Sequence, residues 1–124
     1  HRFNLSDCIM LKDNHIQYVG NITDAVKKVR EKVSHVHKIE VEVETLDQVK
    51  EALSNDVDII MLDNMSVEDM KKAVDLIDNK ALVEASGNIS LEKINLIAST
   101  GVNIISTSAM QTKAGTLDIG LDLL

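Results

Sequence analysis

The sequence predicts an α/β fold of about five parallel strand–helix units, arranged as part of a TIM-like barrel. Between residues 39 and 44 an aliphatic residue alternates with a glutamate, so the glutamates share one face of a strand. The capping pattern Thr45-Leu46-Asp47-Gln48 follows at once, so this strand runs directly into a helix. Such units form parallel sheets with both faces covered, and glutamates inside one are expected to line a polar cavity.

The same strand-then-helix order recurs along the chain and indicates one domain. Strands are expected over 8–11, 39–44, 57–62, 81–85 and 102–105, where apolar residues are concentrated. Residues 12–20 are expected to be a loop. Apolar residues at helical spacing follow at 25–33, 49–53, 70–77 and 91–97. Ser66 and Ser90 are expected to begin the last two of these helices, with Leu91, Ile94 and Ile97 facing inward.

Polar residues stand at or near the carboxyl end of each expected strand. They are Lys12, Glu42, Asp63, Ser86, and Ser106 or Ser108. In barrels of this kind that rim carries the active site. An open doubly wound sheet would also bind ligands there, but the chain has neither a G-x-G-x-x-G nor a P-loop pattern. Because a complete barrel takes ~250 residues, these 124 residues are expected to supply about half of one.

Composition excludes some classes of partner. A net charge of −7 argues against nucleic acid but allows a small phosphorylated ligand held by local cations. Cys8 is the single cysteine, so no internal disulfide is possible, and we expect it to be a buried small residue. No apolar run approaches the ~20 residues of a membrane span. We therefore predict a cytoplasmic protein with no nucleic-acid or membrane partner.

Six motifs in chain order resemble the quinolinate phosphoribosyltransferase family, also called carboxylating nicotinate-nucleotide pyrophosphorylases. The motifs are His1-Arg2-x-x-Leu5-x-Asp7, Leu11-Lys12-Asp13-Asn14-His15, Ile39-Glu40-Val41-Glu42-Val43, Met61-Leu62-Asp63-Asn64-Met65, Glu84-Ala85-Ser86-Gly87 and Leu117-Asp118-Ile119-Gly120-Leu121-Asp122. The resemblance covers residues 1–124 as the C-terminal part of the family's barrel domain. The family's N-terminal domain and first barrel units are expected to be absent.

The resemblance implies an enzyme of NAD biosynthesis. Such an enzyme transfers phosphoribosyl from 5-phosphoribosyl-1-pyrophosphate to quinolinate and releases CO₂ and pyrophosphate, which leaves nicotinate mononucleotide. At full length it is expected to be a homodimer. The isolated 124-residue chain is expected to be inactive, because family cations for both substrates lie in the missing segment.

Three cations match the family's substrate-binding positions: His1, Arg2 and Lys12. Quinolinate is a dicarboxylate, and Arg2 can grip one carboxylate through two parallel N–H bonds. On sequence alone, a solvated His-Arg pair and a surface lysine remain the alternatives for these residues.

Glu42 and Asp63 match family residues beside the ribose, and with Lys12 they are the candidate catalytic residues. Carboxylates there would stabilise the cationic state formed as pyrophosphate leaves. They would also hold Mg²⁺ through its waters, with no direct protein ligand. Glu40 shares the face of Glu42 and is a candidate partner for Lys12. A solvated strand face for Glu42 and a simple turn at Asp63-Asn64 are the alternatives.

The ribose phosphate is expected on the last two strand-end loops. Ser86 and Gly87 precede the helix expected from Ser90, whose free N–H groups would favour an anion, although a plain turn is the alternative. Ser108 and Thr112 occupy family binding positions in the final loop but replace a glycine and a histidine. Asn88 likewise replaces a glycine, and Lys113 can restore positive charge nearby.

Two other functions stay open at this stage. One is a related barrel phosphoribosyltransferase of the molybdenum-transport operon type, which acts on another acceptor. The other is a non-catalytic fragment that serves as a phosphate-binding or dimerising module. A zinc site at His35-x-His37 is not favoured, because no third ligand accompanies the pair.

Overall fold

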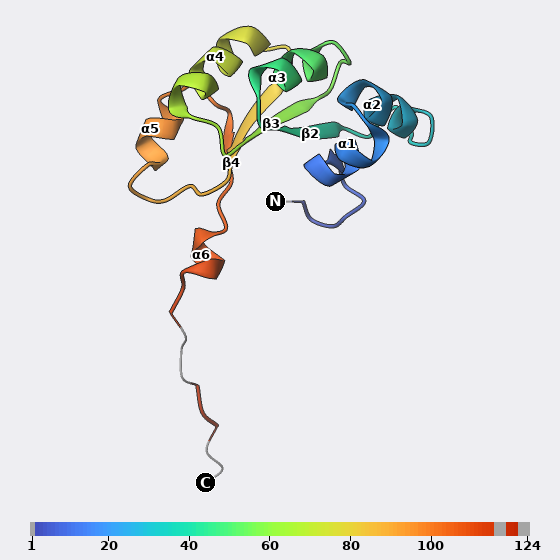
Figure 1. Ribbon diagram of the computed structural model, residues 1–124. Helices are drawn as coiled ribbons and strands as arrows, with labels where there is room; N and C mark the ends of the chain where they lie inside the picture. The colour runs from blue at the N-terminus through green and yellow to red at the C-terminus, as the bar shows by residue number, and fades with distance from the viewer. Residues whose placement is uncertain (1, 116–118, 122–124) are drawn as a thin grey trace.

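The computed structural model describes residues 2–115 and 119–121 (Figure 1). Its strands are β1 (Ile9–Leu11), β2 (Ile39–Val43), β3 (Ile59–Asp63), β4 (Leu82–Ser86) and β5 (Ile104–Ile105). Its helices are α1 (Asp13–Val19), α2 (Ile22–Arg30), α3 (Leu46–Leu53), α4 (Val67–Ile77), α5 (Ile94–Ala98) and α6 (Ala109–Thr112). No helix in the described part of the chain is long and apolar enough to cross a membrane.

The five strands form one parallel sheet in the order β1-β2-β3-β4-β5, which confirms the predicted α/β fold. Each strand therefore pairs with the next one in the sequence. Helices α2, α3 and α4 lie along one side of the sheet, and the N-terminal segment lies on the opposite side (Figure 1). The carboxyl ends of the five strands consequently meet at one edge.

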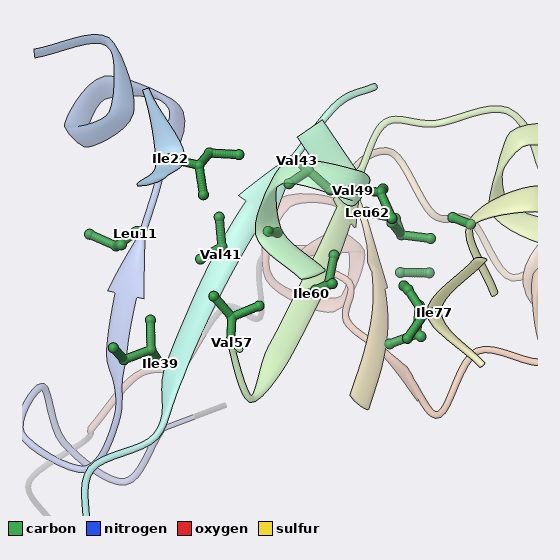
Figure 2. Close-up of a cluster of buried hydrophobic side chains, with 14 of the residues drawn as sticks. Leu11, Ile22, Ile39, Val41, Val43, Val49, Val57, Ile60, Leu62 and Ile77 are labelled. Atoms are coloured by element: carbon green, nitrogen blue, oxygen red, sulfur yellow. The ribbon is translucent and has the colours of Figure 1, made fainter. Parts of the chain in front are cut away.

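The hydrophobic core lies between the sheet and the helices. In Figure 2, Val41 and Ile60 of neighbouring strands lie in one cluster with Val49 of α3 and Ile77 of α4. All four side chains are completely buried. Full burial of such a side chain is worth roughly 1.5–3 kcal/mol, so this layer holds the strands in place.

The opposite face of the sheet carries the other set of side chains, as the alternation predicts. Val41 and Val43 belong to the core cluster, whereas Glu42 between them lines a cavity. On β4, Val83 and Ala85 are in the core, and Glu84 lines the same cavity. The two-residue period of a strand thus separates a core face from a polar face.

Capping interactions begin the middle helices as expected. The Thr45 hydroxyl accepts from the backbone N–H of Gln48, and the Gln48 side chain accepts from the N–H of Thr45, which completes a capping box. Ser66 accepts from the N–H of Asp69 at the start of α4. These caps fix where β2 and β3 turn into their helices.

Three expected segments differ from the structure, and one of them is the expected final loop, which contains helix α6. Residues 13–19 form helix α1 rather than a loop, and it ends at Gly20, whose φ of 116° few other residues tolerate. Helix α5 begins at Ile94, not at Ser90, because residues 90–93 form a turn closed by a hydrogen bond from Lys93 N–H to the Ser90 carbonyl. Leu91, expected to face inward, is 86% exposed.

Candidate functional site

A cavity of about 1010 Å³ opens at the carboxyl ends of the strands. Eight of the nine candidate catalytic and substrate-binding residues line it: Arg2, Lys12, Glu42, Asp63, Ser86, Gly87, Ser108 and Thr112. Asn88, Ser106 and Lys113, which the sequence also pointed to, line it as well. His1 lies outside the described residues. The rim predicted from the sequence is therefore one concave site, built by all five strands and by the segments that follow β1, β4 and β5.

Lys12 and Glu42 form an ion pair across neighbouring strands. Lys12 directly follows β1 and precedes α1, and Glu42 lies near the end of β2. The Lys12 Nζ lies 3.3 Å from Glu42 Oε2, with the Glu42 side chain only 10% exposed. Lys12 is also fixed through its backbone, since its N–H donates to His15 Nδ1 at 3.0 Å. Lys12 thus neutralises the Glu42 carboxylate and is itself still exposed to the cavity.

Asp63 ends β3 beside two asparagines. Asn64 Nδ2 donates to Asp63 Oδ2 at 2.7 Å, and Asn88 Nδ2 donates to Asn64 Oδ1 at 2.9 Å. The backbone N–H of Asn64 donates to the Ser86 carbonyl at 3.0 Å, so the loops after β3 and β4 are joined. Sequence reasoning named Asp63 but missed its link to Asn88, because the two residues are joined only across strands.

Ser86 and Gly87 form the cavity wall at the end of β4. The expectation that a helix starting near Ser90 points its free N–H groups at this loop is wrong, because α5 begins at Ile94 and has five residues. The anion-binding capacity of the loop is therefore limited to its own backbone and its cavity neighbours. Gly87 has a φ of 84°, which a residue with a side chain rarely adopts.

Glu40 and Glu84 form a buried carboxyl pair beside the cavity, which Glu84 lines, and the sequence did not predict this pair. Each is 1% exposed. Burial, followed by the charge of Glu84 and a hydrogen bond to it, raises the pKa of Glu40 to about 7. Lys12 thus contacts Glu42, whereas Glu40, its expected partner, lies beside Glu84. The sequence did contain a signal for Glu84, because apolar and polar residues alternate in Val83-Glu84-Ala85-Ser86 as they do in residues 39–43.

The segment after β5 closes one side of the cavity. Ser106 Oγ donates to Glu84 Oε1, and Thr107 Oγ1 donates to the Ile89 carbonyl at 2.8 Å. Ser108 and Thr112 lie at the start and end of α6, where Thr112 Oγ1 donates to the Ser108 carbonyl at 3.0 Å. Both residues are exposed and line the cavity. The loop that carries Ser108 and Thr112 is therefore accessible from the cavity, where the ribose phosphate is predicted to bind.

Arg2 enters the cavity from the N-terminal segment. Its Nη1 donates to the Cys8 carbonyl at 3.0 Å, and the residue is half-buried, so it is not the freely solvated arginine of the alternative interpretation. Cys8 is half-buried rather than buried as expected. Burial and then the charge of Glu40 raise the pKa of its thiol.

Among residues 2–115 and 119–121, no group of three or more His, Cys, Asp or Glu side chains could enclose a metal ion. Glu42 and Asp63 offer two carboxylates at the cavity, one paired with Lys12 and one with Asn64. Mg²⁺ keeps several of its waters and commonly binds through one or two carboxylates plus substrate phosphates. The donor set therefore fits an ion carried by a phosphorylated substrate.

Comparisons with known proteins agree with this geometry. Residues 1–122 match the family described as quinolinate phosphoribosyl transferase, C-terminal domain. The chain is 45% identical to a probable nicotinate-nucleotide pyrophosphorylase (carboxylating) of Methanothermobacter thermautotrophicus, over 99% of this chain and 46% of that protein. It therefore spans about half the length of the curated relatives it matches.

Solved structures show the same fold. The crystal structure of NadC from Streptococcus pyogenes superposes with a TM-score of 0.86 at 44% identity, over 95% of this chain and 41% of that one. The structure of a nicotinate-nucleotide pyrophosphorylase from Ehrlichia chaffeensis superposes with a TM-score of 0.89 at 42% identity, over 98% of this chain and 44% of that one. With five parallel strands, a cavity at their carboxyl ends and a family match along nearly its whole length, this chain belongs to the quinolinate phosphoribosyl transferase family, through that family's C-terminal domain.

Proposed function

We propose that this chain forms the catalytic rim of an enzyme that transfers phosphoribosyl from 5-phosphoribosyl-1-pyrophosphate to quinolinate. The products are nicotinate mononucleotide, CO₂ and pyrophosphate. The observation that carries the proposal is the juxtaposition of Lys12, Glu42 and Asp63 at the carboxyl ends of three successive strands, in one cavity. Curated relatives of this chain carry the name nicotinate-nucleotide pyrophosphorylase (carboxylating).

Glu42 and Asp63 have the chemistry to assist the departure of pyrophosphate. As the bond from the ribose to pyrophosphate breaks, positive charge develops on the sugar. Two carboxylates fixed beside it would stabilise that charge without having to reorganise. Glu42 is held by Lys12, and Asp63 is held by Asn64, so neither carboxylate is free to turn away.

Arg2 and Lys12 supply the positive charge that a pyridine dicarboxylate requires. Both line the cavity, and Arg2 is anchored by its bond to the Cys8 carbonyl, which leaves the rest of its guanidinium available to a carboxylate. Lys12 keeps 51% of its side chain exposed while it is paired with Glu42. Ser86, Gly87, Ser108 and Thr112 would receive the ribose phosphate on the other side of the cavity.

The proposal includes a Mg²⁺ ion, a homodimer and a cytoplasmic location, all of which derive from the family resemblance. Mg²⁺ bound to the pyrophosphate would neutralise its charge as it leaves. Glu42 and Asp63 are the residues that would hold the ion through its waters, because both carboxylates line the cavity near the carboxyl ends of β2 and β3. His1 would add a further cation for quinolinate, as its place in the family motif implies.

The test is a steady-state assay of the complete gene product that carries this chain. Quinolinate and 5-phosphoribosyl-1-pyrophosphate are supplied with Mg²⁺, and nicotinate mononucleotide and CO₂ are quantified. Stoichiometric formation of both supports the proposal. Activity that appears with a different acid acceptor, and not with quinolinate, would favour a related phosphoribosyltransferase. Absence of product with every acceptor, from protein that is folded by circular dichroism, would contradict an enzymatic role.

A further inference from the structure

Two asparagine amides form a chain of hydrogen bonds that ends on Asp63. Asn88, after β4, donates through Nδ2 to Asn64 Oδ1 at 2.9 Å. Asn64, after β3, donates through its own Nδ2 to Asp63 Oδ2 at 2.7 Å. Both distances are those of good hydrogen bonds. An amide that accepts at its oxygen and donates at its nitrogen is polarised in a way that strengthens the donated bond.

The backbone around this chain of amides is unusually constrained. Asn64 and Asn88 both have left-handed backbones, with φ of 52° and 50°. Asn tolerates this region better than most residues, yet its adoption still carries a cost. The N–H of Asn64 is tied to the Ser86 carbonyl at 3.0 Å. Left-handed residues persist where the surrounding contacts hold them, so the two amides meet in one defined geometry.

Gly87 makes the contact sterically possible. A Cβ built at this position would overlap the side-chain amide of Asn64. The residue between Ser86 and Asn88 must therefore lack a side chain, so that the amide of Asn64 can lie over it and reach Asp63. The three residues Asn64, Gly87 and Asn88 behave as one unit that spans two strand-end loops.

We propose that Asn88 is a positioning residue, which acts through Asn64 to fix the orientation of the Asp63 carboxylate in the cavity. This inference rests on the proposed function, in which Asp63 stabilises the positive charge on the ribose. Asn88 does not itself touch the reacting atoms in this assignment. Its contribution is to keep one Asp63 oxygen engaged by Asn64, so that the other oxygen faces the cavity.

The test uses Asn88→Gly in the complete gene product. Glycine adopts a φ of 50° without strain, so this variant removes the amide and leaves the backbone undisturbed. We expect kcat to fall by about threefold to tenfold, the effect of one lost hydrogen bond. The KM values for quinolinate and for 5-phosphoribosyl-1-pyrophosphate are expected to stay within about twofold of the original, because the substrates keep their own contacts.

Asn79→Gly is the matched control. Asn79 also has a left-handed backbone, with φ of 60°, but it precedes β4 at the opposite end of the sheet from the cavity. It is expected to leave kcat unchanged. Asn64→Gly removes the final link to Asp63, so it should reduce kcat at least as much as Asn88→Gly. Adding Asn88→Gly to Asn64→Gly should then have no further effect, because the chain is already broken.

Crystal structures of the original protein and of Asn88→Gly give a readout that does not depend on activity. The expected result is a rotated or less ordered Asn64 side chain and an Asp63 carboxylate that has lost its single orientation. An unchanged Asp63 in that structure would overturn the proposal. Additive effects of Asn88→Gly and Asn64→Gly on kcat would also overturn it. A rise in the KM for 5-phosphoribosyl-1-pyrophosphate at unchanged kcat would overturn it too, because it would place Asn88 in phosphate binding. An inactive original protein would instead refute the proposed function, and the structures would still judge the role of Asn88.

Discussion

Glu40 and Glu84 share a hydrogen bond between their buried carboxyl groups although β3 separates their strands. Both side chains project from the polar face of the sheet, and each is 1% exposed. Two carboxyl groups this close cannot both ionise without a large cost, so the pair retains a proton at a pH where isolated glutamates have lost theirs. Arg2 and Glu42 also act on Glu40, and the arginine partly offsets the repulsion.

The first prediction follows from the pKa of Glu40, raised from 4.5 to about 7. Between these values the unfolded chain loses this proton while the folded chain keeps it, so stability falls as pH rises. The loss reaches at most about 3 kcal/mol above pH 7. Glu40→Gln is therefore expected to be more stable than the original at pH 8 and similar to it at pH 4.5. Urea denaturation across this range measures the difference.

Glu44→Gln is the control for that experiment. Glu44 is exposed and follows the same strand, so its neutralisation should leave the pH dependence of stability nearly unchanged. Equal effects of the two substitutions would mean that net charge, and not the buried pair, sets the response to pH.

The second prediction concerns turnover. Glu42→Gln or Asp63→Asn is expected to lower kcat by at least tenfold and to change the KM for quinolinate much less. The reason is that these charges act on a cation that exists only in the transition state. Kinetics with both substrates varied separate the two constants. A rise in the quinolinate KM at unchanged kcat would assign these carboxylates to acceptor binding instead.

The third prediction concerns Arg2, whose replacement is expected to change the KM for quinolinate more than kcat. Arg2→Ala removes a guanidinium that faces the cavity and should raise the KM for quinolinate by about tenfold or more, with a smaller effect on kcat. Arg2→Lys is expected to restore little, since an ammonium cannot make two parallel bonds to a carboxylate. Full recovery in Arg2→Lys would show that charge alone matters.

The fourth prediction compares two glycines. Gly87→Ala should destabilise the protein by about 1–2 kcal/mol more than Gly20→Ala. Both positions have positive φ, but the added Cβ at Gly20 meets nothing within 4 Å, whereas at Gly87 it overlaps the Asn64 amide. Thermal unfolding gives the difference. Equal destabilisation would mean that backbone strain dominates and that Asn64 moves aside easily.

The fifth prediction concerns the 124-residue chain expressed alone. Strands β1 and β5 are the two edges of its sheet, and unpaired edges recruit other chains. We expect this chain to self-associate and to form no nicotinate mononucleotide. Sedimentation velocity and the product assay test both parts. A stable monomer that turns over quinolinate would contradict the prediction.

The sequence by itself determined the order of the five strands and the face on which each strand side chain lies, although it did not predict helix α1. Alternation at residues 39–43 placed Glu42 on the polar face, and the pattern at Thr45 and Gln48 predicted the start of α3. These features are local, because a strand repeats every two residues and a cap spans four. Local signals also have limits: Ser90 suggested a helix start, but the chain forms a turn there.

Only the tertiary structure decided which of these side chains meet. Glu40 and Glu84 lie on strands that are not adjacent, and Asn64 and Asn88 follow different strands. No spacing in the sequence encodes such contacts, because they depend on the register and packing of the whole sheet. The sequence therefore determined which residues reach the rim, and the assembled sheet determined that Lys12 would pair with Glu42 and that the pKa of Glu40 would be raised beside Glu84.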